Sequence, residues 1–293
     1  MKKILFKGCG TAIATPFDEN GINFKEFEKL IEEQIKNKID ALIVCGTTGE
    51  SATMTDAERK ETMKFAIDVV NKRVPVILGT GSNCTQSAIL LSQYAESIGA
   101  DGILVVTPYY NKTTQAGLIS HYKAISQSVE IPIILYNVPS RTGVNITPET
   151  CLELSKIDNI VAIKEASGNI SQVAQISALC KDELAIYSGN DDQIVPILSL
   201  GGLGVISVLS NIEPLFTHQM VYDFLEGKID EALKKQLDCL PLVNSLFSEV
   251  NPIPVKAALN IKGYNFGIPR LPLIPMSAEK EENLKKVMKN FNI

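Results

Sequence analysis

A lysine interrupts an apolar run at residues 161–165, which read Val-Ala-Ile-Lys-Glu. If this run is a strand, its side chains alternate between two faces, so Lys164 and Ala162 share one face. If Val161 and Ile163 face covering helices, Lys164 points into the interior of the sheet. An enclosed lysine must pair its charge or lose its proton, and a neutral amine can attack a carbonyl carbon to form a Schiff base. A lysine that reaches solvent from a strand end is the open alternative.

Two other polar residues lie near the end of the preceding apolar run, residues 132–137. Tyr136 closes that run, and its phenol could move protons while a carbonyl oxygen leaves as water. Simple packing of a tyrosine remains the alternative. Arg141 follows at 139–143 and is one of only four arginines in the chain. Its guanidinium could hold a carboxylate through two parallel hydrogen bonds, unless it is merely a solvated loop residue.

A glycine-bounded turn at residues 46–50 reads Gly-Thr-Thr-Gly-Glu. It follows an apolar run and precedes a helical pattern. Glycines permit close approach of the backbone, and the hydroxyls and N–H groups of Thr47 and Thr48 suit a carboxylate. An ordinary turn with threonine caps is the competing interpretation.

Histidine is scarce, which narrows the class of catalysis. His121 and His218 are the two histidines, and neither has an acidic or histidine partner at metal-ligand spacing. A metal-dependent aldolase needs several such ligands, and no phosphate-binding P-loop occurs either. We therefore expect neither a metal nor a bound cofactor, which leaves lysine catalysis as the leading option.

The composition is that of an ordinary globular chain. The formal net charge is −5, and no block of like charge occurs. A nucleic-acid partner is not expected, because such partners select basic surfaces. No apolar stretch reaches membrane-spanning length, so no membrane partner is expected. Six cysteines without C-x-x-C spacing indicate reduced thiols, mostly buried, and a cytosolic protein.

Eight short apolar runs alternate with helical patterns. The runs cover residues 10–14, 41–45, 74–79, 102–107, 132–137, 161–165, 184–189 and 204–208. The helical patterns cover residues 24–36, 56–71, 85–98, 116–128, 148–154, 170–179, 193–199 and 213–225. Most runs are apolar at consecutive positions, which is typical of parallel strands buried on both faces. Eight such units predict a (β/α)8 TIM barrel. A doubly wound sheet is the alternative. A nucleotide-binding sheet of that kind carries a glycine-rich loop after its first strand, and this sequence has no such loop there.

The barrel is expected to occupy residues 1–226, with a C-terminal helical appendage at 227–293. Helical patterns at 229–247, 254–261 and 278–291, separated by prolines, predict three helices there. Barrel enzymes carry their chemistry at the carboxyl ends of the strands, where all the candidate residues lie.

Several motifs at these positions resemble the dihydrodipicolinate synthase and N-acetylneuraminate lyase family, and the resemblance covers the whole chain. They lie at residues 46–50 (GTTGE), 107–110 (TPYY), 136–143 (YNVPSRTG), 163–165 (IKE) and 251–256 (NPIPVK). Within the family, the third motif together with 107–111 (TPYYN) is similar to the synthases rather than to the sugar-acid lyases. The resemblance implies condensation of pyruvate with L-aspartate 4-semialdehyde, in diaminopimelate and lysine biosynthesis.

The resemblance also implies roles for four residues that move protons or form bonds. Lys164 would form the Schiff base and Tyr136 would relay protons. Thr47 would link Tyr136 to Tyr110, which enters the site from a neighbouring subunit in this family. A homotetramer built as a dimer of dimers is therefore expected.

The remaining implied roles concern substrate binding. The backbone N–H groups of Thr47 and Thr48 would hold the pyruvate carboxylate, and Arg141 the carboxylate of the semialdehyde. The carbonyl groups of Gly189 and Ile206 match positions that line the pocket.

Two rival functions use the same scaffold. A lyase for sialic acid or a 2-keto-3-deoxy sugar acid would use the same Lys164 and Tyr136, although Arg141 favours the synthase. A binding or regulatory barrel without catalysis would form no covalent adduct with pyruvate.

Overall fold

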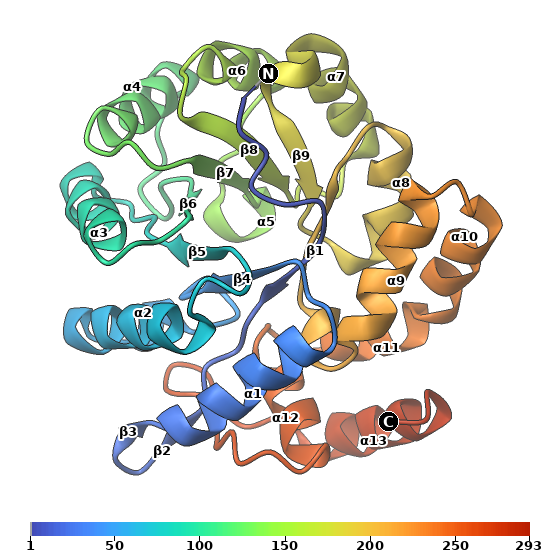
Figure 1. Ribbon diagram of the computed structural model, residues 1–293. Helices are drawn as coiled ribbons and strands as arrows, with labels where there is room; N and C mark the ends of the chain where they lie inside the picture. The colour runs from blue at the N-terminus through green and yellow to red at the C-terminus, as the bar shows by residue number, and fades with distance from the viewer. Residues whose placement is uncertain (1) are drawn as a thin grey trace.

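A closed barrel of eight parallel strands forms the centre of the molecule (Figure 1). The computed structural model describes residues 2–293. The barrel strands are β1 (Gly8–Ala12), β4 (Ala41–Val44), β5 (Val76–Gly79), β6 (Gly102–Val106), β7 (Ile133–Asn137), β8 (Ile160–Glu165), β9 (Ala185–Ser188) and β10 (Gly204–Ser207). Each pairs with its neighbours in chain order, and β1 closes the ring against β10. The predicted barrel is confirmed, and the open sheet is excluded.

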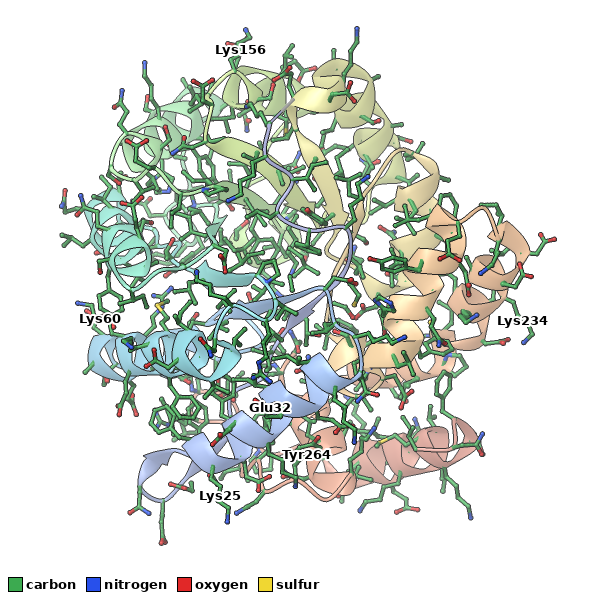
Figure 2. The ribbon with its side chains drawn as sticks, in the orientation of Figure 1. Lys25, Glu32, Lys60, Lys156, Lys234 and Tyr264 are labelled. Carbon is green, nitrogen blue, oxygen red and sulfur yellow. The ribbon has the colours of Figure 1, made fainter. Side chains whose placement is uncertain are left out.

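Helices form a ring outside the strands, as Figure 1 shows. The helices of the ring are α1 (Phe24–Lys36), α2 (Asp56–Val70), α3 (Thr85–Ser97), α4 (Gln115–Ser126), α6 (Pro148–Ser155), α7 (Ile170–Cys180), α8 (Ile194–Ser199) and α9 (Pro214–Leu225). The short helix α5 (Pro139–Thr142) lies inside this ring in Figure 1. The helix α1 shows why the sequence pattern worked. Phe27, Leu30, Ile31 and Gln34 recur at helical spacing and are the residues it buries. Charged side chains labelled in Figure 2, such as Lys60 and Lys156, project away from the ring.

Several short elements of the barrel region were not predicted, and two of them lie near the turns that carry candidate residues or precede α1. One is the small hairpin of β2 (Phe17–Asp18) and β3 (Gly21–Ile22). The other is the single-turn helix α5, which carries Arg141. Both are too short to show a period in the sequence, and α5 starts at a proline, whose ring fits the first turn of a helix.

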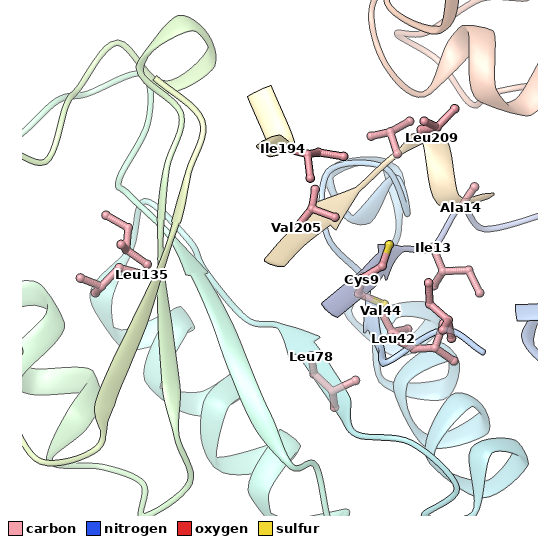
Figure 3. Close-up of a cluster of buried hydrophobic side chains, with 14 of the residues drawn as sticks. Cys9, Ile13, Ala14, Leu42, Val44, Leu78, Leu135, Ile194, Val205 and Leu209 are labelled. Atoms are coloured by element: carbon pink, nitrogen blue, oxygen red, sulfur yellow. The ribbon is translucent and has the colours of Figure 1, made fainter. Parts of the chain in front are cut away.

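Side chains of the strands divide between two buried clusters. One lies between the strands and the helices, and Figure 3 shows part of it. The other fills the barrel and includes Ile43, Ile77, Leu104, Ile134 and Ile206. On strand β8, Ala162 belongs to the inner cluster and Ile163 to the outer one. Lys164, two residues after Ala162, therefore points inward as predicted.

The expected orientation of Val161 is wrong. Val161 packs in the inner cluster although Ile163, two positions later, packs outside. The pairing of β7 with β8 shifts between Ile133 and Ile134, whose partners are Ile160 and Ala162. Val161 is thus an extra residue in β8, and such a bulge reverses the alternation at that point.

The amino-terminal end of the barrel is closed by the segment before β1. Leu5 and Phe6 lie in the inner cluster, and the Phe6 ring stacks on Tyr187 with centroids 4.3 Å apart. The Tyr187 hydroxyl donates to the Phe6 carbonyl oxygen over 2.6 Å. The side chains of this segment therefore fill the barrel at its amino-terminal end.

After α9 the chain forms four helices where three were predicted. They are α10 (Ile229–Asp238), α11 (Leu240–Leu246), α12 (Ile253–Ile261) and α13 (Ala278–Asn290). The predicted helix at 229–247 breaks at Cys239, and Pro241 stands in the first turn of α11. Proline removes a backbone donor and is tolerated there but not inside a helix. No helix within residues 2–293 is long and apolar enough to span a bilayer.

Candidate active site

Lys164 and Tyr136 are direct neighbours across strands β8 and β7. Both are buried, with 5% and 7% of their surfaces exposed. The Lys164 Nζ atom lies 4.5 Å from the centroid of the Tyr136 ring. Since both strands run parallel and both residues are next to last, the amine and the phenol lie at the carboxyl end of the barrel.

A comparison of the two buried lysines separates a reactive amine from a structural one. Lys256 is completely buried, and its ammonium forms an ion pair of 2.7 Å with Glu50. Lys164 has no such ion pair within residues 2–293, and its Nζ atom lies over the aromatic ring of Tyr136. An enclosed amine that has no carboxylate at ion-pair distance is free to attack a carbonyl carbon as a nucleophile.

Glycine at position 189 makes room for the lysine. A β-carbon added to Gly189 would lie 3.1 Å from Cε of Lys164 and 2.6 Å from Cβ of Ala166. The Gly189 N–H donates to the Glu165 carbonyl oxygen over 2.8 Å, which fixes the backbone directly after β9. Ile206, on β10, is fully buried in the inner cluster. The structure thus brings Gly189 next to Lys164 and places Ile206 within the barrel.

The turn at residues 46–50 lies at the same end, directly after β4. Thr48 is buried and its Oγ1 atom accepts a hydrogen bond of 3.0 Å from Nδ2 of Asn251. The Thr15 hydroxyl donates to the Gly49 carbonyl oxygen over 2.9 Å. Glu50 closes the turn in the left-handed region, with φ of 55°. The turn is therefore held by contacts from both ends of the chain, although Thr47 is exposed.

A cavity of about 50 Å³ lies between the turn and the barrel, and both Thr47 and Tyr136 line it. Arg59 also lines it, and its Nη2 atom donates to the Gly79 carbonyl oxygen over 2.7 Å. Burial lowers the pKa of Arg59. Tyr110 does not line this cavity. It follows β6, projects with 91% of its surface exposed, and has a backbone φ of 67°.

Arg141 is exposed on α5, in a loop whose two ends are tied together. Asn137 donates from Nδ2 to Oδ1 of Asn145 over 2.8 Å and to Oε2 of Glu165 over 2.9 Å. Gln172, on α7, accepts from Asn145 over 2.7 Å and donates to Glu165 over 3.3 Å. Glu165 is the residue after Lys164, so this buried network connects the Arg141 loop to the lysine strand.

With this geometry in view, comparisons with known proteins decide the family. The sequence profile of the Dihydrodipicolinate synthetase family matches residues 5–291. The chain belongs to this family. A 4-hydroxy-tetrahydrodipicolinate synthase of Clostridium novyi (strain NT) is 58% identical over 288 residues, which cover 98% of this chain and 97% of that protein.

Solved structures of dihydrodipicolinate synthases share the fold along the whole chain. The enzyme from Thermotoga maritima matches with a TM-score of 0.97 and 42% identity, over 99% of each chain. The chloride-inhibited enzyme from Acinetobacter baumannii, solved in complex with pyruvate, matches with a TM-score of 0.96 and 41% identity. That match covers 98% of this chain and 99% of the other.

Sequence reasoning missed a buried carboxylate in this family member. Asp191 follows β9, is 2% exposed, and accepts backbone hydrogen bonds from Val208 (3.0 Å) and Leu209 (2.8 Å) through Oδ2. Burial raises the pKa of Asp191, while hydrogen bonds and the charge of Lys164 oppose that shift. Its Oδ1 atom has no partner within residues 2–293. Nothing in the local sequence marks this residue, because its environment comes from β10 and from the lysine on β8.

Proposed function

We propose that this family member condenses pyruvate with L-aspartate 4-semialdehyde, as a 4-hydroxy-tetrahydrodipicolinate synthase of diaminopimelate and lysine biosynthesis. The observation that carries the proposal is Lys164, a buried lysine that has no ion pair within residues 2–293 and lies beside Tyr136 at the carboxyl end of the barrel. Relatives at 58% identity that are 4-hydroxy-tetrahydrodipicolinate synthases support the same activity.

The chemistry follows from an amine in a dry site. The Lys164 amine adds to C2 of pyruvate, and the carbonyl oxygen leaves as water to give an iminium. The iminium withdraws electrons from the methyl group, which loses a proton and becomes the nucleophilic end of an enamine. This carbon attacks the aldehyde carbon of the semialdehyde. The amino group of that substrate then displaces the lysine from C2, which closes the ring and regenerates the free amine.

Proton transfer is assigned to Tyr136, because its ring borders the lysine Nζ atom at 4.5 Å. Addition and loss of water at C2 both require a proton carrier at that carbon. We assign Thr47 to the same relay, since it shares the small cavity with Tyr136. Tyr110 completes the relay from a neighbouring subunit.

Substrate binding is assigned to the turn at residues 46–50 and to the loop that carries Arg141. The backbone N–H groups of Thr47 and Thr48 hold the pyruvate carboxylate, and Arg141 holds the carboxylate of the semialdehyde. The carbonyl groups of Gly189 and Ile206 line the pocket between them. Residues 1–226 carry this catalysis, and residues 227–293 form the C-terminal appendage.

The assembly we propose is a homotetramer in the cytoplasm, arranged as a dimer of dimers. The exposed Tyr110 supports it. A bulky residue with positive φ is strained in isolation, and such a conformation persists where surrounding structure holds it. An adjacent Tyr109, 40% exposed, extends the aromatic surface on which a second copy could pack.

Borohydride trapping tests the proposed chemistry. Incubation with pyruvate and borohydride should attach a reduced adduct to Lys164 and abolish activity, because reduction makes the Schiff base permanent. Peptide mass mapping locates the adduct, and the buried Lys256 serves as an internal control, since its amine is fully enclosed and pairs with Glu50 at 2.7 Å. Labelling at another lysine, with Lys164 unmodified, would falsify the mechanism. Sugar acids offered as substrates in place of pyruvate and the semialdehyde test the lyase alternative directly.

A further inference from the structure

The C-terminal appendage reaches into the turn at residues 46–50 with two buried polar side chains. Asn251 lies just before α12 and is 5% exposed, and Lys256 lies within α12 and is fully buried. They contact Thr48 and Glu50, which are about 200 residues earlier in the chain. Barrel strands alone therefore do not hold the turn to which we assign pyruvate binding.

The Lys256 contact anchors the end of the turn. Its Nζ atom lies 2.7 Å from Oε1 of Glu50, and the Arg270 backbone N–H donates to Oε2 of the same carboxylate over 3.0 Å. Glu50 has a backbone φ of 55°, which is unfavourable for a residue other than glycine. A buried, paired carboxylate in a strained backbone fixes this end of the turn in one conformation.

The Asn251 contact acts on the hydroxyl of Thr48 itself. Nδ2 of Asn251 donates to Oγ1 of Thr48 over 3.0 Å. A hydroxyl that accepts a hydrogen bond still has its own hydrogen to donate. Within residues 2–293, the Thr48 hydroxyl donates to no protein acceptor, although the residue is only 3% exposed. Its hydrogen is thus available to an anion placed against the turn.

We propose that Asn251 is a positioning residue for pyruvate. By donating to Thr48 it sets the direction of that hydroxyl, so that the hydroxyl hydrogen points to the pyruvate carboxylate. The inference rests on the proposed function, and it gives the appendage a part in substrate binding. Asn251 touches Thr48 rather than the reacting atoms, so its effect falls on pyruvate affinity and not on bond formation.

The appendage also contacts the barrel at a place away from Asn251, and a residue there provides a matched control. Lys262, just after α12, donates to the Ile212 carbonyl oxygen over 2.6 Å and lies 3.5 Å from Glu213. It ties the same helix to the barrel without contacting the turn at 46–50. Loss of Lys262 loosens the appendage, whereas loss of Asn251 removes the contact to Thr48.

The first measurement compares Asn251→Ala, Asn251→Asp and Lys262→Met in steady-state kinetics. Asn251→Ala should raise KM for pyruvate about tenfold, the effect of one hydrogen bond to a charged site, and change kcat by less than about threefold. Asn251→Asp should be worse than Ala, because its carboxylate accepts the Thr48 hydrogen and repels the substrate anion. Lys262→Met should leave KM for pyruvate within about twofold of the parent protein, whatever its melting temperature.

A double-mutant cycle with Thr48→Val shows whether Asn251 acts through the hydroxyl. If it does, the Asn251→Ala, Thr48→Val double variant binds pyruvate no more weakly than Thr48→Val alone. Additive losses, or recovery of KM in Asn251→Asp, would overturn the inference. Thermal melts identify any variant that does not fold. If one Asn251 variant does not fold, the KM of the other Asn251 variant for pyruvate tests the inference. If the parent protein is trapped on Lys164 by pyruvate and borohydride but Asn251→Ala binds pyruvate normally, this inference fails while the proposed function stands.

Discussion

Gly189 faces the side chain of Lys164 so closely that a β-carbon at position 189 would lie 3.1 Å from Cε of the lysine. A second contact is tighter, because the same carbon would lie 2.6 Å from Cβ of Ala166. Neither Ala166 nor the Glu165 carbonyl oxygen, 3.1 Å away, can swing aside like the end of a flexible chain. The position of the lysine amine therefore depends on the absence of a side chain on the neighbouring strand.

Gly189→Ala should slow the trapping of pyruvate on Lys164 by about tenfold or more, because a shift of even 1 Å in a reacting group is costly. The measurement is the rate of borohydride-dependent labelling at fixed pyruvate. The control is Gly227→Ala, at a glycine with φ of 83° and no atom within 4 Å of its added β-carbon. That variant should lose stability through backbone strain but label at the parent rate. Equal labelling by both variants would show that the site tolerates the added carbon.

The strands could be predicted from local periodicity, and the inward direction of Lys164 follows from Ala162 and Ile163, although the bulge at Val161 breaks the alternation earlier in β8. Neighbouring strands in a parallel barrel also fix which residues meet, so the approach of Tyr136 to Lys164 could be anticipated. The bond between Asn251 and Thr48 could not, since it joins residues 203 apart and depends on how α12 docks. Asp191 escaped notice for the same reason.

Arg141→Ala should weaken use of the semialdehyde more than Schiff-base formation with pyruvate. Arg141 is exposed on α5, whereas Lys164 is buried on β8, so removing Arg141 leaves the amine in place. Loss of a charge-assisted contact to a carboxylate should cost about 2–4 kcal/mol in transition-state binding. The measurement is kcat/KM for the semialdehyde beside the pyruvate labelling rate. An equal loss in both would indicate a structural role for Arg141.

Mixed oligomers should recover activity from two inactive variants. If Tyr110 acts in the site of a neighbouring subunit, a hybrid of Tyr110→Phe and Lys164→Ala subunits contains a site with both Lys164 and Tyr110. Such hybrids should regain part of the parent activity, whereas each variant alone stays inactive. Hybrids can be isolated with two different affinity tags and assayed directly. No recovery in verified hybrids would place Tyr110, Tyr136 and Lys164 in one chain.

The last prediction concerns the buried network behind the Arg141 loop. Gln172→Leu keeps most of the side-chain volume but removes the hydrogen bonds to Asn145 (2.7 and 3.1 Å) and to Glu165 (3.3 Å). Asn145 closes the loop by accepting from Asn137, so the loop should lose its fixed position. The Nδ2 group of the half-buried Asn145 would also lose its partner, which costs up to about 1–3 kcal/mol of unfolding free energy.

We expect Gln172→Leu to raise KM for the semialdehyde about fivefold or more, while labelling of Lys164 by pyruvate changes less than about twofold. Lys164 retains its position because the Asn137 contact to Glu165, 2.9 Å, remains. The matched control is Gln175→Leu, an exposed residue on the same helix, which should change neither quantity. The two variants also separate loop positioning from a general effect of leucine on α7. A Gln172→Leu protein that is less stable but has an unchanged semialdehyde KM would mean that the network supports the fold and not the orientation of Arg141.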